Sequence, residues 1–272
     1  MHPVTVLSIA GSDSGGGAGI QADLRTFAAF GVHGTTAVTA VTAQNTLGVN
    51  DVAVMPTSLI TSQVRAVTDD FRVAAVKTGM LGDAEVVQTV AELARENLLA
   101  QLVVDPVLVS TTRHSLMRDG GIRAYREALF PHATVITPNL SEACALCGVD
   151  ISEVTTRAHM ISLGTELLSL GPQFVLVKGG HLASQSEELE VPDVLVSADG
   201  AEIFEGPRIF TSNDHGTGCT LSAAICARLA LGSSVPDAVR DAKVFVSRAL
   251  TGGASWRLGA GRGPLDHLGW NQ

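Results

Sequence analysis

Two glycine-rich segments of the chain carry residue types that bind anions. The first, residues 11–19 with the sequence GSDSGGGAG, follows an apolar run and precedes a helical pattern. The second, residues 213–220 with the sequence NDHGTGCT, precedes an apolar helical pattern. Glycines let backbone amides approach a ligand closely, and the first turn of a helix offers unpaired amides to an anion. Both segments are therefore predicted to bind phosphates or other polar groups.

The first segment matches neither of the common nucleotide-binding motifs. Gly11 and Gly16 have the spacing of a Walker A loop, but Gly17 stands where that loop requires lysine. The dinucleotide pattern fails as well, since no G-x-G-x-x-G register fits and no acidic residue closes a second strand at the usual distance. A tight turn without function is the alternative interpretation, although five glycines exceed what a turn needs.

Cys219 has the most reactive side chain of the second segment. At a helix start beside Gly216 and Gly218, its thiolate is expected to be favoured, which makes it a candidate proton acceptor or nucleophile. The amides of these three residues are predicted to form an anion hole for a phosphoryl group in transfer. A buried, inert cysteine is the alternative, and it is the interpretation that we prefer for Cys226.

Two carboxylates are predicted at strand ends, where ligands of α/β sheets bind. Asp105 lies in the string VVDPV and Glu142 in the string TPNLSE. Mg²⁺ takes one or two protein carboxylates and completes its shell with water and phosphates, so both residues are candidate ligands. Asn139 and Glu142 also fit a helix N-cap with an acidic third residue, a role compatible with metal binding.

Lysine is rare in this chain, which contains 15 arginines but only Lys77, Lys178 and Lys243. The first two end apolar runs in VKTG and VKGG, where a strand meets a flexible turn, and this position favours a functional role. The pair Cys144 and Cys147 has no second pair and no histidine at metal-ligand spacing, so core packing is the better interpretation. The sequence also lacks a G-x-S-x-G nucleophile motif.

These residues are predicted to be positioned by alternating strands and helices. Strand-like runs occur at residues 4–10, 37–43, 73–80, 102–109, 134–137 and 174–178, with helical patterns near 84–99, 140–147 and 158–170. Such alternation is typical of βαβ units and a mostly parallel sheet. Residues 193–210 read as short hairpin strands and predict an antiparallel edge. Helices at 218–231 and 236–251 complete the chain.

Composition limits the classes of partner and location. The 272 residues are 46% hydrophobic and contain no linker-like run, so one domain spanning residues 1–272 is expected. A net charge of −9 argues against a nucleic acid partner. The start of the chain lacks a targeting pattern and no run of 18 apolar residues occurs, so we expect a cytoplasmic protein without membrane contact. The four cysteines are expected to be thiols.

Seven strings occur in order along the chain that closely resemble the hydroxymethylpyrimidine/phosphomethylpyrimidine kinases of thiamine biosynthesis. They are AGSD with GGGAGIQAD (residues 10–23), QNT (44–46), KTGML (77–81), DPV (105–107), TPN with Glu142, KGGH (178–181) and HGTGCT (215–220). The match runs from about Val4 to Gly263-Pro264 and His267. Each string is only moderately specific, whereas seven in order are very specific.

The resemblance implies an α/β fold, the ribokinase-like three-layer αβα sandwich, with a mostly parallel central sheet and a short antiparallel edge, usually as a homodimer. It implies transfer of the ATP γ-phosphoryl group to a pyrimidine hydroxymethyl oxygen and then to the resulting monophosphate. The residues that it assigns are Gly11, Asp23, Gln44, Met80 and Val107 for the pyrimidine, Asn139, Lys178, Thr217 and Lys243 for ATP, Asp105 and Glu142 for Mg²⁺, and Gly216, Gly218 and Cys219 for catalysis.

The chain departs from related sugar kinases and from its own family at two places. Most sugar kinases of the superfamily carry aspartate where this chain has Cys219, so the catalytic base differs in kind. After Asp105 the family has a small Ser/Gly turn, whereas this chain has the string STTRH with Arg113.

Two other functions stay open. Pyridoxal kinases of the same cysteine-containing group act on a similar flat ring with a hydroxymethyl group. A non-catalytic ligand-binding protein that retains the fold is the alternative from another class, and the intact set of candidate site residues argues against it.

Overall fold

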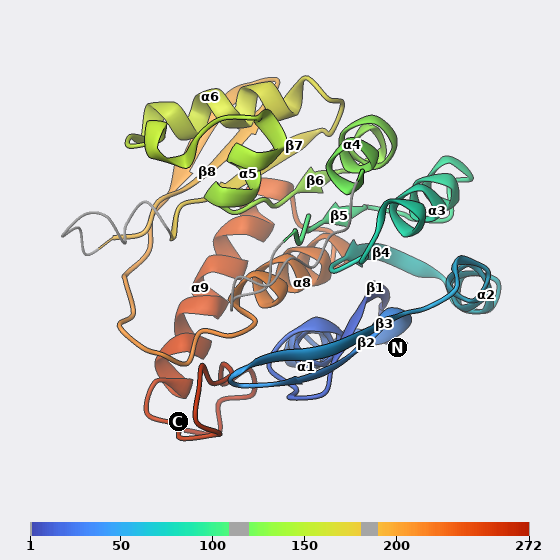
Figure 1. Cartoon of the computed structure of the whole chain (residues 1–272), viewed down its shortest axis with the longest axis horizontal. Helices are drawn as coiled ribbons and strands as arrows, with labels where there is room; N and C mark the ends of the chain where they lie inside the picture. The colour runs from blue at the N-terminus through green and yellow to red at the C-terminus, as the bar shows by residue number, and fades with distance from the viewer. Residues whose placement is uncertain (1, 109–119, 181–189, 272) are drawn as a thin grey trace.

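The computed structural model describes residues 2–108, 120–180 and 190–271. Within these residues, the centre of the fold is a nine-stranded sheet in the order β3-β2-β1-β4-β5-β6-β7-β8-β9 (Figure 1). The strands are β1 (Thr5–Asp13), β2 (His33–Asn45), β3 (Gly48–Val54), β4 (Val73–Thr78), β5 (Val103–Val104), β6 (Val135–Ile136), β7 (Phe174–Lys178), β8 (Asp193–Ser197) and β9 (Gly200–Phe204).

The helices connect these strands and cover the sheet. They are α1 (Gly19–Ala29), α2 (Thr57–Thr68), α3 (Ala84–Arg95), α4 (Gly121–Ala124), α5 (Leu140–Cys147), α6 (Arg157–Leu168), α8 (Thr217–Ala230) and α9 (Val235–Gly253). A π-helical turn at Tyr125–Leu129 continues α4, and short 3₁₀ turns lie at Phe130–His132 and Ile151–Glu153.

The sheet is parallel in its centre and antiparallel at both edges. β2, β1, β4, β5, β6 and β7 pair in parallel. β3 pairs antiparallel with β2 at one edge, and β8 and β9 form an antiparallel hairpin beside β7 at the other. The parallel strands therefore direct their carboxyl ends to one side of the sheet, where the candidate site residues follow them.

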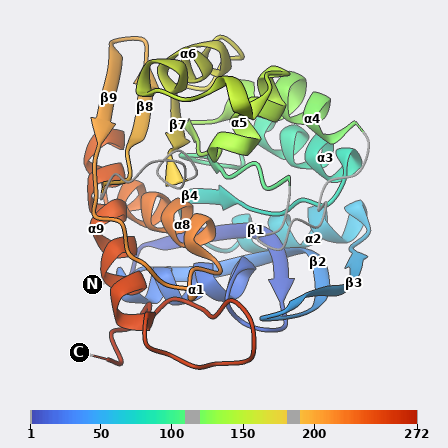
Figure 2. The same cartoon turned by 60° about the vertical axis from the view of Figure 1, so that its left-hand side comes forward.

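Both faces of the central sheet are buried, because side chains of opposite orientation along its parallel strands enter different apolar cores. Leu7 and Ile9 of β1 pack with α2 to α6, whereas Val6 packs with α1, α8 and α9. β7 behaves likewise, with Val175 and Val177 on the first face and Leu176 on the second. The result is the three-layer αβα sandwich expected from the sequence, with the two helical layers visible in Figures 1 and 2.

Most expected elements are confirmed, with differences at the first sheet edge. The strand expected at 37–43 extends over His33–Asn45, and its partner β3 with the following helix α2 was not predicted. The hairpin after residue 193 is confirmed as β8 and β9. Among the described residues, no helix combines the length and apolar composition needed to cross a membrane.

Candidate active site

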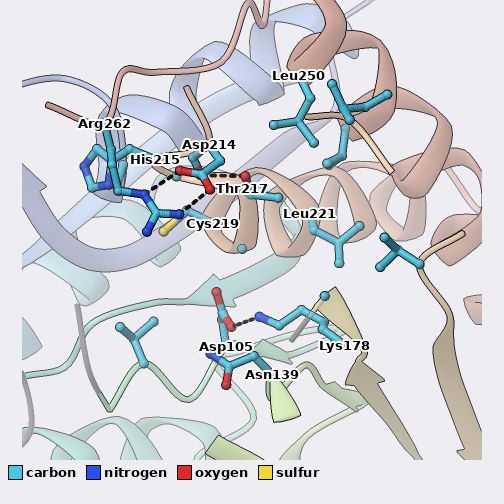
Figure 3. A pocket seen from close by; sticks show the side chains of 18 of the residues that line it. Asp105, Asn139, Lys178, Asp214, His215, Thr217, Cys219, Leu221, Leu250 and Arg262 are labelled. Carbon is cyan, nitrogen blue, oxygen red and sulfur yellow. Dashed lines mark hydrogen bonds and ion pairs between the residues drawn. The ribbon is translucent and has the colours of Figure 1, made fainter. Parts of the chain in front are cut away.

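A cavity of about 1240 Å³ opens at the carboxyl ends of the parallel strands. It is lined by every candidate site residue except Asp23: Gly11, Gln44, Met80, Asp105, Val107, Asn139, Glu142, Lys178, Gly216, Thr217, Gly218, Cys219 and Lys243. Figure 3 shows Asp105 and Lys178 rising from the sheet toward the start of α8, where Cys219 lies. Residues up to about 230 positions apart in the sequence thus meet around one space.

The first glycine-rich loop is folded around the carboxylate of Asp13. Its Oδ1 accepts the amide of Gly15 at 2.8 Å, and its Oδ2 accepts those of Gly17 and Ala18 at 3.0 and 2.9 Å. Burial alone would raise the pKa of Asp13, but hydrogen bonds from His215 and from these amides outweigh it and lower the pKa. The loop amides nearest Asp13 are therefore used internally, and Asp13 shapes the loop as a fixed anion.

The second glycine-rich loop leads directly into α8. Gly216 has a φ of +92°, a conformation that glycine adopts readily, and Thr217 Oγ1 donates to the backbone oxygen of Asp214 at 2.6 Å. The amides of Gly218 and Cys219 follow in the first turn, where a helix provides no internal acceptor. The start of α8 therefore faces the cavity at the position where the sequence predicts an anion site.

The two glycine-rich loops touch each other. A Cβ added at Gly216 would lie 1.9 Å from the backbone oxygen of Gly17, and a Cβ at Gly17 would lie 2.4 Å from His215 Cδ2. Neither position has room for a side chain without a backbone shift. The close approach joins the ends of β1 and α8 into one wall of the cavity.

Asp105 and Lys178 form an ion pair opposite the helix start. Lys178 Nζ lies 2.9 Å from Asp105 Oδ1, which also accepts from Thr137 Oγ1 at 3.2 Å. A Cβ added at Gly218 would lie 3.2 Å from Lys178 Nζ, so this cation borders the anion-accepting amides. Burial acts to lower the pKa of Lys178, but Asp105 and Glu142 outweigh it and raise the pKa, which keeps the ammonium charged.

Glu142 has the capping role that its spacing predicts. Asn139 Oδ1 accepts the Glu142 amide at 2.9 Å, and Glu142 Oε2 accepts the Asn139 amide at 2.7 Å. Burial raises the pKa of Glu142 to about 7; Lys178 acts in the opposite direction and Asp105 in the same direction. Glu142 therefore changes its charge near neutral pH while it lines the cavity.

The Cys219 thiol differs from the sequence-based expectation that its thiolate is favoured. Burial, the largest effect, raises the pKa of Cys219 to about 11, and the neighbouring carboxylates of Asp23 and Asp105 act in the same direction. The Lys77 ammonium opposes them without cancelling them. The expectation of a favoured thiolate is therefore corrected. Loss of hydration destabilises the Cys219 thiolate more than the Lys77 ammonium stabilises it.

Asp23 occupies a different place from the other predicted pyrimidine contacts. It is fully buried below the cavity, where both carboxylate oxygens lie 2.9 Å from Lys77 Nζ and Oδ2 accepts from Ser8 Oγ at 2.5 Å. The structure thus offers no ligand surface at Asp23, in contrast to the direct contact implied by the resemblance. The reason is that α1 turns this residue inward to meet β4 rather than toward the cavity.

Lys243 lines the cavity but is held by protein groups. Its Nζ lies 2.5 Å from Asp193 Oδ2 and 2.8 Å from the backbone oxygen of Val191. A Cβ added at Gly206 would lie 2.8 Å from Lys243 Cε, so the lysine stem packs against that turn. A nucleotide that binds Lys243 would therefore share its ammonium group with Asp193.

Gln44 is held at both ends of its amide. Its Nε2 lies 3.1 Å from His215 Nε2, and its Oε1 lies 3.1 Å from Thr42 Oγ1. His215 Nε2 also lies 3.0 Å from Asp13 Oδ2. The expected polar group at the end of β2 is thus part of a network that reaches both glycine-rich loops.

Several site residues received no role from the sequence. Asp13 and His215 lie inside the recognised strings, but only their environment reveals that they connect the two loops. Lys77 was singled out at a strand end without a partner, and the partner, Asp23, is 54 positions away. Arg262 pairs with Asp214 at the cavity wall, and nothing in its sequence context indicates this. The departure around Arg113 lies outside the described residues.

Comparison with known families gives a model for phosphomethylpyrimidine kinase that matches residues 13–266. The chain belongs to the phosphomethylpyrimidine kinase family. It is 46% identical over 268 residues to a hydroxymethylpyrimidine/phosphomethylpyrimidine kinase of Streptomyces coelicolor, covering 98% of this chain and 95% of that protein. Recognition from the seven strings is thereby confirmed, as are the fold class and a kinase activity.

Solved structures of similar kinases cover nearly the whole chain. A phosphomethylpyrimidine kinase from Clostridium difficile has a TM-score of 0.79 at 38% identity, covering 91% of this chain and 99% of that one. The pyridoxal kinase of Staphylococcus aureus in complex with AMP-PCP and pyridoxal has a TM-score of 0.88 at 33% identity, covering 100% and 96%. Members of this fold therefore act on both ring types.

Proposed function

We propose that the protein transfers the γ-phosphoryl group of ATP to the hydroxymethyl oxygen of 4-amino-5-hydroxymethyl-2-methylpyrimidine, and then to the resulting monophosphate. The observation that carries this proposal is the convergence on one cavity of an anion-accepting helix start and the anchored amide of Gln44. The first suits a phosphoryl group and the second a flat polar ring. The identity to the Streptomyces coelicolor kinase over almost the whole chain supports the same substrate.

The protein's contribution to phosphoryl transfer is mainly positioning and electrostatic stabilisation. The amides of Gly218 and Cys219 would donate to oxygens of the transferring group, and Lys178 beside them would balance its negative charge. The acceptor hydroxyl loses its proton as its oxygen bonds to phosphorus. Cys219 is our candidate acceptor for that proton, although a pKa of about 11 leaves roughly one thiol in 10⁴ ionised at pH 7.

Magnesium fits the acidic side of the cavity. The described residues contain no cluster of three or more His, Cys, Asp or Glu side chains suited to a metal ion. Asp105 and Glu142 both line the cavity, and Mg²⁺ needs only one or two carboxylates when phosphates and water complete its shell. Bound Mg²⁺ would neutralise charge on the nucleotide phosphates, and Glu142 would contribute most above its pKa of about 7.

Pyridoxal is the second candidate acceptor, favoured by the structural likeness to the Staphylococcus aureus enzyme. The deciding experiment measures ADP production with ATP and either the aminopyrimidine or pyridoxal as acceptor, and with neither. We expect a kcat/KM for the aminopyrimidine at least about tenfold above that for pyridoxal, the margin given by one well-made polar contact. A preference for pyridoxal would change the assigned acceptor to pyridoxal. Absence of ADP production with both acceptors would support a non-catalytic binding protein.

We further propose a cytoplasmic homodimer. Val41 and Leu47, at 47% and 67% exposed, place apolar side chains on β2 and on the turn to the edge strand β3, where a second copy would cover them. Light scattering after size-exclusion chromatography tests this, since a dimer has twice the 28.1 kDa mass of the chain. A Leu47→Glu variant that stays dimeric would remove this edge as the interface.

A further inference from the structure

His215 lies between the two glycine-rich loops and contacts a functional group on each side. Its Nε2 is 3.0 Å from Asp13 Oδ2 and 3.1 Å from the nearer end of the Gln44 amide. The imidazole packs directly on Gly17, where an added Cβ would lie 2.4 Å away. The far end of the same amide is 3.1 Å from Thr42 Oγ1. The Gln44 amide is therefore held between His215 and Thr42.

The Asp13 carboxylate determines where the His215 proton lies. The oxygen that faces His215 already accepts two backbone amides, from Gly17 and Ala18. An ionised carboxylate oxygen accepts hydrogen bonds and cannot donate them. A hydrogen must therefore lie on Nε2 of His215, which donates it to Asp13.

This hydrogen in turn decides which end of the Gln44 amide faces His215. An NH₂ group directed at Nε2–H would set two donors against each other, whereas the amide oxygen accepts a second branch of that hydrogen bond. The two ends of an amide have nearly the same shape, so the network decides between them. We therefore assign the flipped amide, with Oε1 at His215 and Nε2 at Thr42. Nε2 then donates to Thr42 Oγ1, whose hydroxyl donates to the Ser12 backbone oxygen at 3.0 Å.

We propose that His215 is a specificity-determining residue that fixes the polarity of the Gln44 amide. The oxygen of the Gln44 amide uses one of its two acceptor positions for His215, and the amide nitrogen uses one of its two hydrogens for Thr42. One acceptor and one donor remain for a ligand, in a fixed order.

This inference rests on the proposed function, because the acceptor must be an aminopyrimidine. Its ring nitrogen beside an amino group presents an acceptor followed by a donor. The oxo analogue, with a carbonyl in place of the amino group, presents the reverse order. Since the hydroxymethyl group must point to the phosphoryl site, the ring cannot turn over to exchange the two positions. An amide that is free to flip would accept both rings.

Titration calorimetry with the aminopyrimidine and its oxo analogue tests the proposal. Wild type should prefer the amino ring by about tenfold or more, because the oxo ring opposes like groups at the fixed amide. His215→Phe keeps the ring against Gly17 but removes the donor, and its preference should fall below roughly threefold. His215→Gln retains a donor of similar reach and should preserve the preference. The control His33→Phe alters the histidine at the other end of β2, which stacks on Phe71, and should bind as wild type does.

An undiminished preference in His215→Phe would overturn the proposal, as would an equal loss in the His33→Phe control. If His215→Phe fails to fold, nitrogen chemical shifts of His215 in wild type decide instead, since a bare Nε2 contradicts the assignment and a protonated one supports it. Failure of wild type to bind either ring would refute the proposed function, while the chemical shifts would still report on the His215 network.

Discussion

The buried ion pair between Asp23 and Lys77 gives a stability prediction that the sequence alone could not provide. Both side chains have no exposed area, and Lys77 Nζ lies 2.9 Å from each Asp23 oxygen. Removing one partner of such a pair leaves a buried charge without compensation, which costs about 3–5 kcal/mol. We expect Lys77→Met to lower the free energy of unfolding by this amount. For a chain of this size, the melting temperature should fall by roughly 6–20 °C.

The double variant Asp23→Asn with Lys77→Met separates the effect of the unpaired Asp23 charge from the effect of lost packing. It removes both charges while the new amide keeps an acceptor for the Ser8 hydroxyl, which donates to Asp23 at 2.5 Å. Replacement of both members of a buried ion pair by uncharged residues often leaves the free energy of unfolding nearly unchanged. The double variant should therefore recover at least about half of the loss seen in Lys77→Met.

The pH dependence of the stability of Lys77→Met provides an independent test. Burial, the largest effect, raises the pKa of Asp23 above its ordinary 3.8, and Lys77 is the strongest opposing influence. Without Lys77 the folded state therefore binds a proton that the unfolded chain releases above about pH 4. Stability of this variant should fall as pH rises above 4, by up to about 1.4 kcal/mol per unit, relative to the double variant.

Urea unfolding followed by circular dichroism at pH 5, 6 and 7 measures these differences. The matched control is Arg65→Met, which breaks an ion pair whose side chains are 45% and 49% exposed. Exposed pairs contribute less than about 1 kcal/mol. A loss in Lys77→Met no larger than that in Arg65→Met would refute the reasoning, as would a double variant that recovers none of the stability lost in Lys77→Met.

Four further predictions concern the cavity. Cys219→Ser should lose on the order of 10²-fold in kcat with little change in either KM, whereas wild-type turnover would leave only the Cys219 amide in the mechanism. Because burial raises the pKa of this thiol to about 11, its alkylation rate should rise about tenfold per pH unit from 7 to 10; a flat profile contradicts that pKa. Gln44→Ala should raise the pyrimidine KM by the equivalent of roughly 1–3 kcal/mol and leave the ATP KM unchanged. A pyrimidine KM equal to that of wild type would show that Gln44 does not recognise the ring. Since burial raises the pKa of Glu142 to about 7, apparent Mg²⁺ affinity should weaken as pH falls from 8 to 6, and Glu142→Gln should abolish that dependence; an unchanged slope would place Mg²⁺ elsewhere.

The sequence predicted the parts of the fold and site that depend on local pattern. Apolar runs followed by glycine or a polar residue located β1, β4 and β7, and with them Gly11, Lys77 and Lys178. The capping box of Asn139 and Glu142 was visible from spacing alone, because both partners lie in one helical turn.

Features that depend on distant partners were not predictable in the same way. Asp23 in a recognised string suggested a ligand contact, but its partner Lys77 on β4 makes it an internal charge. The chemistry of Cys219 also depends on other elements of the fold. They bury its thiol, and this burial raises the pKa despite the position of Cys219 at a helix start. The antiparallel edge of β3 was missed because its residues are only partly buried or exposed and form no strong apolar run.

The contact between the two glycine-rich loops bears on how the chain is made. Asp13 and His215 are 202 positions apart, so their hydrogen bond cannot form until most of the chain has left the ribosome. At about 5–20 residues per second, the first loop waits roughly 10–40 seconds for the second. During this interval, Val6 on β1 lacks the cover of α8 and α9 that it has in the finished protein. Nascent chains stalled before residue 217 should therefore expose an apolar sheet face and be bound by chaperones.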